Sequence, residues 1–182
     1  LDTINKDNID CLRISDFNTT GLVGIMDDEN DSPFYLLTKG SGTSDKTEGN
    51  GGSKGIGKYA CFVASDLNTV FYSTKAYNEE KHREEKGYIG RSMHILDRPN
   101  LMTMGTGYYA INSDNVPFKD ELSIDKSFKR KDGEYGTDIY LIGYSSKNWK
   151  ENIAYKVLEG FMGSIIFNDF EVQVDDLLIN KN

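Results

Sequence analysis

The chain has 182 residues, a length that predicts a single domain. Its 29 acidic residues outnumber the 21 basic ones, and the net charge of −8 argues against direct nucleic-acid binding, which needs Lys and Arg gathered against phosphates. No apolar run approaches the roughly 20 residues that cross a bilayer, so we expect no membrane contact. The two cysteines, Cys11 and Cys61, match no metal or redox spacing. We therefore expect a cytoplasmic protein with reduced thiols.

The N-terminal half predicts a strand, a long loop, a helix and a second strand. Residues 11–16 alternate in side-chain type as a strand does. Residues 38–54 have no apolar period and are rich in Gly, Ser and Thr, which is typical of a loop. Apolar residues then recur at helical spacing, which predicts a helix over residues 55–66. The β-branched and aromatic residues 68–74 predict a strand.

The C-terminal half predicts a sheet followed by one long helix. The charge run at residues 78–86 is typical of a solvated hairpin tip or helix turn. Three further strands are predicted at residues 88–96, 103–110 and 136–142. Apolar residues every four positions from Trp149 to Ile165 predict an amphipathic helix, and a strand pair follows at 169–179. Because few strands are separated by a crossover helix, we expect an α+β two-layer sandwich: a mixed, mostly antiparallel sheet with helices on one face.

Two polar residues are predicted on apolar strand faces. Alternation puts Asp16 on the face of Leu12 and Ile14, where an ionised carboxylate is costly unless something donates hydrogen bonds to it. The alternative is an ordinary Asp that caps the turn after the strand. Thr137 shares a face with Ile139, and its alternative is an ordinary strand threonine.

The stretch GNGGSKGIGK, residues 49–58, predicts an anion site. Bare backbone before a helix start presents unpaired N–H groups and the positive end of the helix dipole to a phosphate. A flexible linker is the alternative. Residues 52–58 formally read G-x-x-x-x-G-K, but Tyr59 stands where a P-loop needs a hydroxyl for magnesium, and no buried strand precedes the glycines. The Rossmann pattern fails for lack of a βαβ unit.

Four motifs in order resemble the GHKL superfamily, which includes gyrase, heat-shock chaperones, histidine kinases and MutL. They are ISDFNTTGL (14–22), TKGSGTSDK (38–46), GGSKGIGKYACFVASDLNTVFYST (51–74) and GTDIYLI (136–142). The third is most similar to the chaperone and MutL branches. DFNTTGL and GSKGIGK are also similar to a group of bacterial ATP-binding proteins within the superfamily.

The resemblance implies a Bergerat fold that holds ATP and Mg²⁺ beneath a lid made by residues 38–54. It assigns Asp16 to the adenine amino group, Thr137 to the adenine ring, Gly21 to close backbone approach, and the N–H groups of Gly55 and Gly57 to the triphosphate. The remaining nucleotide-binding positions it implies are Asn18, Leu22, Lys39, Gly52, Ser53, Lys54, Ile56 and Lys58. An ATP-dependent homodimer of the intact protein is the partner that it implies.

This sequence departs from the family pattern at two places. No amphipathic helix carrying a water-activating acid and a magnesium-binding Asn precedes the first strand. Asn5 and Asn8 lie in a polar stretch without helical apolar spacing, so we assign the magnesium role to neither. DFNTTGL also has one extra residue before its glycine, which alters the turn at Asn18. We therefore expect residues 1–182 to be one GHKL-type domain from a longer protein, lacking its N-terminal helix and downstream domains. We expect it to be inactive by itself because the water-activating acid is absent, and no catalytic residue is assigned.

Three functions fit these expectations. The first is an ATP-binding domain that, in the intact protein, hydrolyses MgATP to drive a conformational change. The second is a non-catalytic module that responds to nucleotide without turnover. The third is a histidine kinase catalytic domain, which the chaperone-like third motif disfavours.

Overall fold

The computed structural model describes residues 2–25, 31–40, 57–93, 105–124, 126 and 129–182. The chain divides into two compact units, Leu1–Tyr144 and Ser145–Asn182. The first unit contains a sheet with helices, and the second contains one helix with a small hairpin. The expectation of a single GHKL-type domain over the whole chain stays a prediction.

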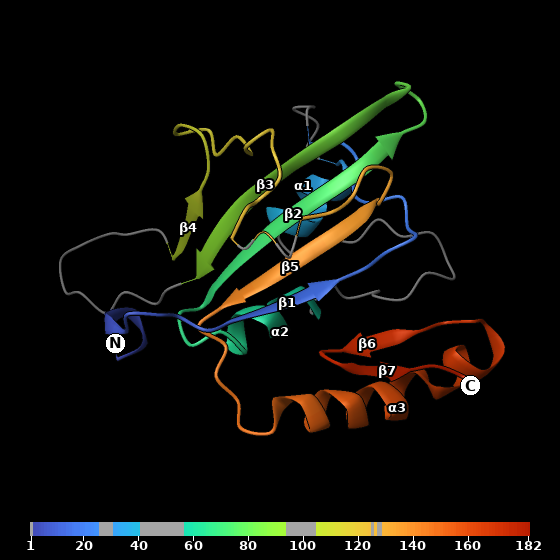
Figure 1. The fold of residues 1–182 in the computed structure, drawn as a ribbon. Helices are drawn as coiled ribbons and strands as arrows, with labels where there is room; N and C mark the ends of the chain where they lie inside the picture. Colours follow the sequence, from blue (N-terminus) through green and yellow to red (C-terminus); the bar gives the residue numbers. More distant parts are fainter. Residues whose placement is uncertain (1, 26–30, 41–56, 94–104, 125, 127–128) are drawn as a thin grey trace. The chain divides into compact units, whose positions relative to one another are not determined.

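The first unit is built on an antiparallel sheet, drawn in Figure 1. Its described strands are β1 (Cys11–Ser15), β2 (Thr69–Asn78), β3 (Arg83–Met93), β4 (Thr106–Tyr109) and β5 (Gly136–Ile142). Their order is β1-β5-β2-β3-β4, and every pairing between them is antiparallel. The predicted α+β class with a mostly antiparallel sheet is confirmed, and β5 has the predicted bounds.

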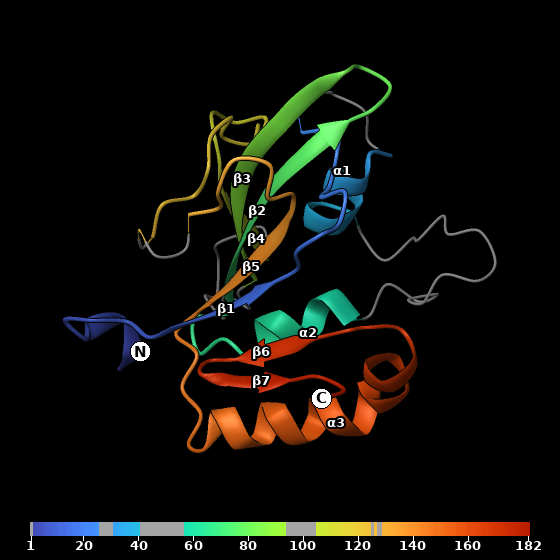
Figure 2. The same ribbon diagram turned by 45° about the vertical axis from the view of Figure 1, so that its right-hand side comes forward.

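Two short helices, α1 (Pro33–Thr38) and α2 (Gly57–Val63), cover one face of this sheet (Figure 2). Phe34 of α1 and Phe62 of α2 are buried in one cluster with Val70, Tyr72 and Ile89 of the sheet. Val70 and Tyr72 lie two residues apart on β2, so they share the face that meets the helices. The two-layer sandwich with helices on one face is confirmed.

Both helices differ in extent from the prediction. The sequence analysis assigned no helix to residues 33–38, because six residues are too few to establish a period. The local signal is a cap: the Ser32 hydroxyl accepts from the Tyr35 N–H at 3.2 Å, and Pro33 occupies the first turn. The helix predicted to end at residue 66 ends at Val63.

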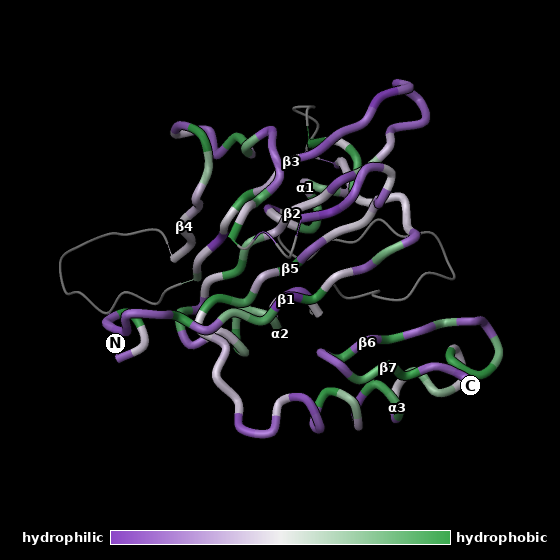
Figure 3. The backbone as a smooth tube through the Cα atoms, viewed as in Figure 1, coloured by the Kyte–Doolittle hydropathy of each residue, from purple (hydrophilic) through white to green (hydrophobic). Residues whose placement is uncertain are grey.

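The β2–β3 hairpin extends further than predicted into the charge run. Its tip is hydrophilic (Figure 3), as expected of a solvated turn, and His82 lies there, exposed, with a left-handed φ of 47°. β2 nevertheless continues to Asn78, and Glu85 of β3 is only 1 % exposed. The prediction that the whole run is solvated is therefore wrong at Glu85.

The second unit contains α3 (Trp149–Phe167), β6 (Val172–Val174) and β7 (Leu177–Ile179). β6 and β7 pair antiparallel, and Ala154, Ile165, Val174 and Ile179 form its buried core. The predicted helix and strand pair are confirmed, but Phe161, which the pattern places on the apolar face of the helix, is 50 % exposed. Among the helices that the structure describes, none combines the length and apolarity needed to span a bilayer.

Candidate functional site

Asp16 and Thr137 form the contact at the centre of the predicted site. Asp16 directly follows β1, and its backbone N–H donates to the Thr137 carbonyl of β5 at 3.1 Å. In return, the Thr137 N–H donates to Asp16 Oδ1, and the Thr19 hydroxyl donates to Oδ2. The two residues predicted to contact adenine, 121 positions apart in sequence, therefore touch each other.

The Asp16 carboxylate is exposed, so the prediction that it points into the core is wrong. β1 forms one edge of the five-stranded sheet, and even Ile14 on the same strand face is 48 % exposed. The donors that a buried acid would have needed from a ligand come from Thr137 and Thr19. A carboxylate can accept about four hydrogen bonds, so acceptor positions remain open to solvent.

The segment after this acid is attached to β2 through Gly21 and Leu22. Gly21 has a φ of +66°, and a Cβ there would lie 2.4 Å from the Lys75 carbonyl oxygen. The Leu22 N–H donates to the Thr74 hydroxyl at 2.9 Å. Asn18, in the predicted irregular turn, is exposed and has a left-handed φ of 56°. The glycine is thus required for close approach to the sheet itself.

The predicted phosphate end is described only from the start of α2. Gly57 is the first residue of this helix and is exposed. The predicted positions outside the described residues are Gly52, Ser53, Lys54, Gly55 and Ile56, together with residues 41–54 of the predicted lid. Within the described residues this helix covers the seven residues Gly57–Val63, and residues 55 and 56 of the predicted helix lie outside them.

Two of the three predicted lysines, Lys39 and Lys58, are within the described residues, and both meet the C-terminal end of α1. Lys58 Nζ donates to the carbonyl of Leu36 at 3.2 Å and to that of Gly40. Burial and the nearby charge of Arg91 lower the pKa of Lys58. Lys39 directly follows α1. Lys58 therefore stabilises the carbonyl end of α1 in this structure, a role that the sequence did not indicate.

The adenine end and the start of α2 lie on the same face of the sheet. Leu22, which follows the acid, and Tyr59 of α2 pack against the same core cluster of buried residues. In Figures 1 and 2, the C-terminal end of β1 and the N-terminal end of α2 point toward the same end of the sheet. Asp16 and the described start of α2 are therefore on one face of the sheet, and the glycines before α2 lie outside the described residues.

Sequence reasoning missed the residues that support the acid. Thr74 of β2 donates to the Gly136 carbonyl at 3.1 Å, and its hydroxyl lies 3.4 Å from that of Thr137. Arg130 donates to the backbone carbonyls of both Asp16 and Thr137. Thr74 and Arg130 lie far from the acid in sequence, and no local pattern links them to it. The only local signal is the glycine before Thr137, which marks a close backbone approach.

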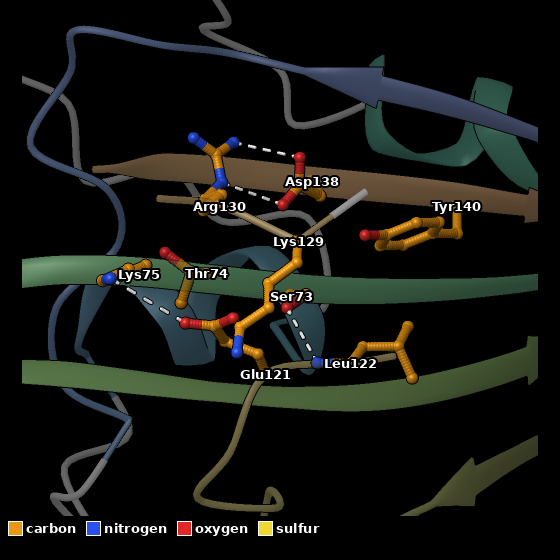
Figure 4. A pocket seen from close by; sticks show the side chains of 9 residues that line it. All are labelled: Ser73, Thr74, Lys75, Glu121, Leu122, Lys129, Arg130, Asp138 and Tyr140. Carbon is orange, nitrogen blue, oxygen red and sulfur yellow. Dashed lines mark hydrogen bonds and ion pairs between the residues drawn. The ribbon is translucent and has the colours of Figure 1, made fainter. Parts of the chain in front are cut away.

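A second polar cluster lies on the opposite face of the sheet, shown in Figure 4. Lys75, which alternates with Thr74 along β2, is buried; its ammonium lies 3.7 to 3.9 Å from the carboxylates of Glu84, Glu121 and Asp132. The hollow drawn there has about 10 Å³, room for one water molecule, and a neighbouring cavity has about 290 Å³. The acid of the predicted site lines neither of them.

Comparison with protein-family models, with curated proteins and with solved structures finds no match to this chain.

Proposed function

We propose that this chain binds an adenine nucleotide, with the Asp16 carboxylate accepting a hydrogen bond from the adenine amino group. The observation that carries the proposal is the exposed carboxylate, held by the Thr137 N–H on one oxygen and the Thr19 hydroxyl on the other. Both donors fix its direction without using all of its acceptor positions. Such a group selects a ligand that presents a donor.

The donor set also discriminates between purines. Adenine presents an amino donor at the position where guanine presents a carbonyl acceptor. An ionised carboxylate directed at that position therefore attracts the amino group of adenine and repels the carbonyl of guanine. The Thr137 hydroxyl, 3.4 Å from that of Thr74, can donate to a ring nitrogen beside the amino group, because that nitrogen is an acceptor.

The phosphate end of this proposal rests on the glycine-rich sequence and on the position of α2. Gly57 and Lys58 start a helix on the same face of the sheet as the acid, and Lys58 would leave the α1 carbonyls to reach a phosphate. In the described part of the chain, no group of three or more His, Cys, Asp or Glu side chains could hold a metal ion. In this proposal Mg²⁺ arrives bound to the phosphates of the nucleotide.

Hydrolysis of MgATP, and the ATP-dependent homodimer expected with it, belong to the intact protein in this proposal. Phosphate release by the intact protein, measured with ATP in excess, separates the hydrolysing domain from the non-catalytic nucleotide-responsive module. Binding without release would select the second.

The test is an NMR titration of ¹⁵N-labelled chain with ATP and, separately, GTP, in the wild type and in Asp16→Asn. The amide in Asn presents a donor to the adenine amino group and removes a charged acceptor, a loss of about 1.5–3 kcal/mol, or roughly 10- to 150-fold in affinity. We expect ATP to shift the Thr137 and Gly21 amide signals of the wild type and GTP to bind more weakly. Asp10→Asn, which changes an exposed acid just before β1, is the matched control and should bind as the wild type does. Equal ATP affinity in Asp16→Asn and the wild type would refute the assignment.

A further inference from the structure

We propose that Arg130 is a positioning residue that holds the Asp16 carboxylate in its ligand-binding orientation from behind the sheet. This inference rests on the proposed function, because it concerns the acid to which adenine would bind. It adds a residue outside every motif that the sequence singles out.

The guanidinium of Arg130 joins the end of β1 to the start of β5. Its Nη2 donates to the Asp16 carbonyl at 2.7 Å and to the Thr137 carbonyl at 3.1 Å. Nε donates to Asp138 Oδ2 at 2.9 Å, and Asp138 Oδ1 lies 3.0 Å from the same Nη2, so the two hydrogens of Nη2 are shared among three acceptors. The side chains of Arg130 and Asp138 are 4 % and 5 % exposed, so this contact is shielded from solvent.

The partners of Arg130 are themselves held in place. Asp138 accepts a third hydrogen bond, from the Ser15 hydroxyl at 2.6 Å, which links it to the last residue of β1. The Phe17 ring lies 4.6 Å from the Arg130 guanidinium carbon and covers it. Figure 4 shows the side chains of Arg130 and Asp138 side by side, joined by dashed lines that mark their contacts.

Gly136 makes this close packing feasible. It has a φ of +151°, and a Cβ there would lie 2.2 Å from the Asp16 carbonyl oxygen and 2.7 Å from Arg130 Nη1. Any side chain would push apart the carbonyl and the guanidinium. Position 136 therefore accepts only glycine while Arg130 bonds to both strands.

The carbonyl and the N–H of Thr137 both take part in holding Asp16. On one side its carbonyl is bound by Arg130, and on the other its N–H binds the Asp16 carboxylate. The carbonyl of Asp16 is also bound by Arg130, so both the backbone and the side chain of the acid are fixed. A carboxylate fixed before the ligand arrives avoids the entropic cost of ordering it on binding. A lysine would keep a charge near Asp138 but lacks the planar fork that reaches several acceptors.

The experiment measures the Thr137 amide proton by NMR during an acid titration of the ligand-free chain, in the wild type and in Arg130→Lys. In the wild type this signal should move more with pH than it does in Asp16→Asn, because only the wild-type hydrogen bond has a carboxylate acceptor. In Arg130→Lys we expect that movement to fall by at least half, and the ATP affinity to fall about 3- to 10-fold. In an Asp16→Asn background, Arg130→Lys should cause no further loss of affinity.

Arg91→Lys is the matched control. Arg91 is also buried and also donates to a backbone carbonyl, that of Thr38 at 3.0 Å, but on the helix side of the sheet. Its substitution should lower stability while leaving the Thr137 titration unchanged. If Arg130→Lys does not fold, Ser15→Ala removes only the hydroxyl that orients Asp138 and should reduce the same movement to a smaller extent.

The readouts separate the two proposals. The amide titration needs no nucleotide, so a wild type that does not bind ATP refutes the proposed function even if Arg130→Lys loses the Thr137 movement. An unchanged Thr137 titration in the folded Arg130 variant overturns the positioning role even if ATP binds. Equal losses of the Thr137 movement in Arg91→Lys and Arg130→Lys would also overturn it.

Discussion

Glu85 is a buried acid whose removal should destabilise the first unit more than its place in a charge run indicates. One of its oxygens accepts from the Gly24 N–H at 2.8 Å. The other accepts from Asn78 Nδ2 at 2.9 Å and from Arg83 at 3.1 and 3.2 Å. With 1 % of its surface exposed, Glu85 links the segment after β1 to the β2–β3 hairpin.

Glu85→Gln keeps the shape of the side chain and replaces one acceptor with an NH₂ donor. Whichever way the amide turns, it faces at least one donor, either the Gly24 N–H or the groups of Asn78 and Arg83. A buried donor left without a partner costs about 1–3 kcal/mol, and a lost charged hydrogen bond about 1.5–3 kcal/mol. Arg83 is 43 % exposed, so solvent screens its share. We expect the free energy of unfolding to fall by about 2–4 kcal/mol.

Urea unfolding followed by circular dichroism at pH 7 measures this loss. The matched control is Glu84→Gln, one residue away, whose side chain is 43 % exposed. Its carboxylate lies 3.9 Å from the Lys75 ammonium, which also has the carboxylates of Glu121 and Asp132 beside it. We expect the control to change stability by less than about 0.5 kcal/mol. A loss for Glu85→Gln no larger than that of the control would refute the reasoning.

The difference in free energy of unfolding between the wild type and Glu85→Gln should depend on pH, because of the pKa of Glu85. Burial alone raises this pKa, but the hydrogen bonds from Gly24, Asn78 and Arg83 outweigh burial and hold the pKa below its usual value. A lowered pKa in the folded state gives stability that is fully present above the unfolded pKa of about 4.3 and is lost as the pH falls through the folded value. The difference in free energy of unfolding between the wild type and Glu85→Gln should therefore decrease as the pH falls below about 4. A gap that widens there would contradict the assignment.

Two further substitutions test the sheet and the helix layer. Thr74→Val keeps the volume but leaves the Leu22 N–H and the Gly136 carbonyl without the hydroxyl that bonds both, so we expect a loss of about 2–4 kcal/mol in urea unfolding. Phe62→Ala empties a site that is 3 % exposed and should cost about 3–5 kcal/mol, against less than about 0.5 kcal/mol for Val63→Ala, whose side chain is 85 % exposed. Equal losses in the last pair would mean that α2 does not pack on the sheet through Phe62.

The sequence predicted the elements whose own residues carry a clear period. β5 was predicted over residues 136–142, and the structure has a strand with those bounds. The long helix α3 was predicted from apolar residues at every fourth position, and it is present over Trp149–Phe167. The burial follows the patterns only in part: Asp138 and Tyr140 are buried on the other face of β5, and Phe161 of the apolar stripe of α3 is 50 % exposed.

Elements stabilised by distant partners could not be read from local patterns. β2 was predicted to end at Thr74, yet it continues to Asn78 because each of its residues from 69 to 78 pairs with β3. Its last residues include a buried lysine and a buried asparagine, which a search for apolar alternation rejects. The buried Glu85 carboxylate accepts a hydrogen bond from the N–H of Gly24, 61 residues away. A local sequence pattern does not reach a partner at that distance.

The candidate site shows the same division between local and distant information. The acid and the threonine were chosen for their places on strand faces, and the structure confirms that they touch, because antiparallel pairing brings the end of β1 to the start of β5. Arg130 was not chosen, although it bonds to the backbone of both residues. It lies in a charged segment of the sequence, as surface arginines commonly do, and only the structure shows which carbonyls accept its hydrogen bonds.

The exposure of Asp16 also changes the size of the effect expected from a nucleotide. A carboxylate buried without donors would have gained several kcal/mol from the first ligand that bonded to it. Thr137 and Thr19 already supply those donors, so adenine competes only with water for the remaining acceptor positions. The gain is then that of one charged hydrogen bond, about 1.5–3 kcal/mol. For the same reason Asp16→Asn should leave the fold intact, because an amide oxygen can still accept from the Thr137 N–H. A large loss of stability in that variant would show that the acid supports the fold rather than a ligand.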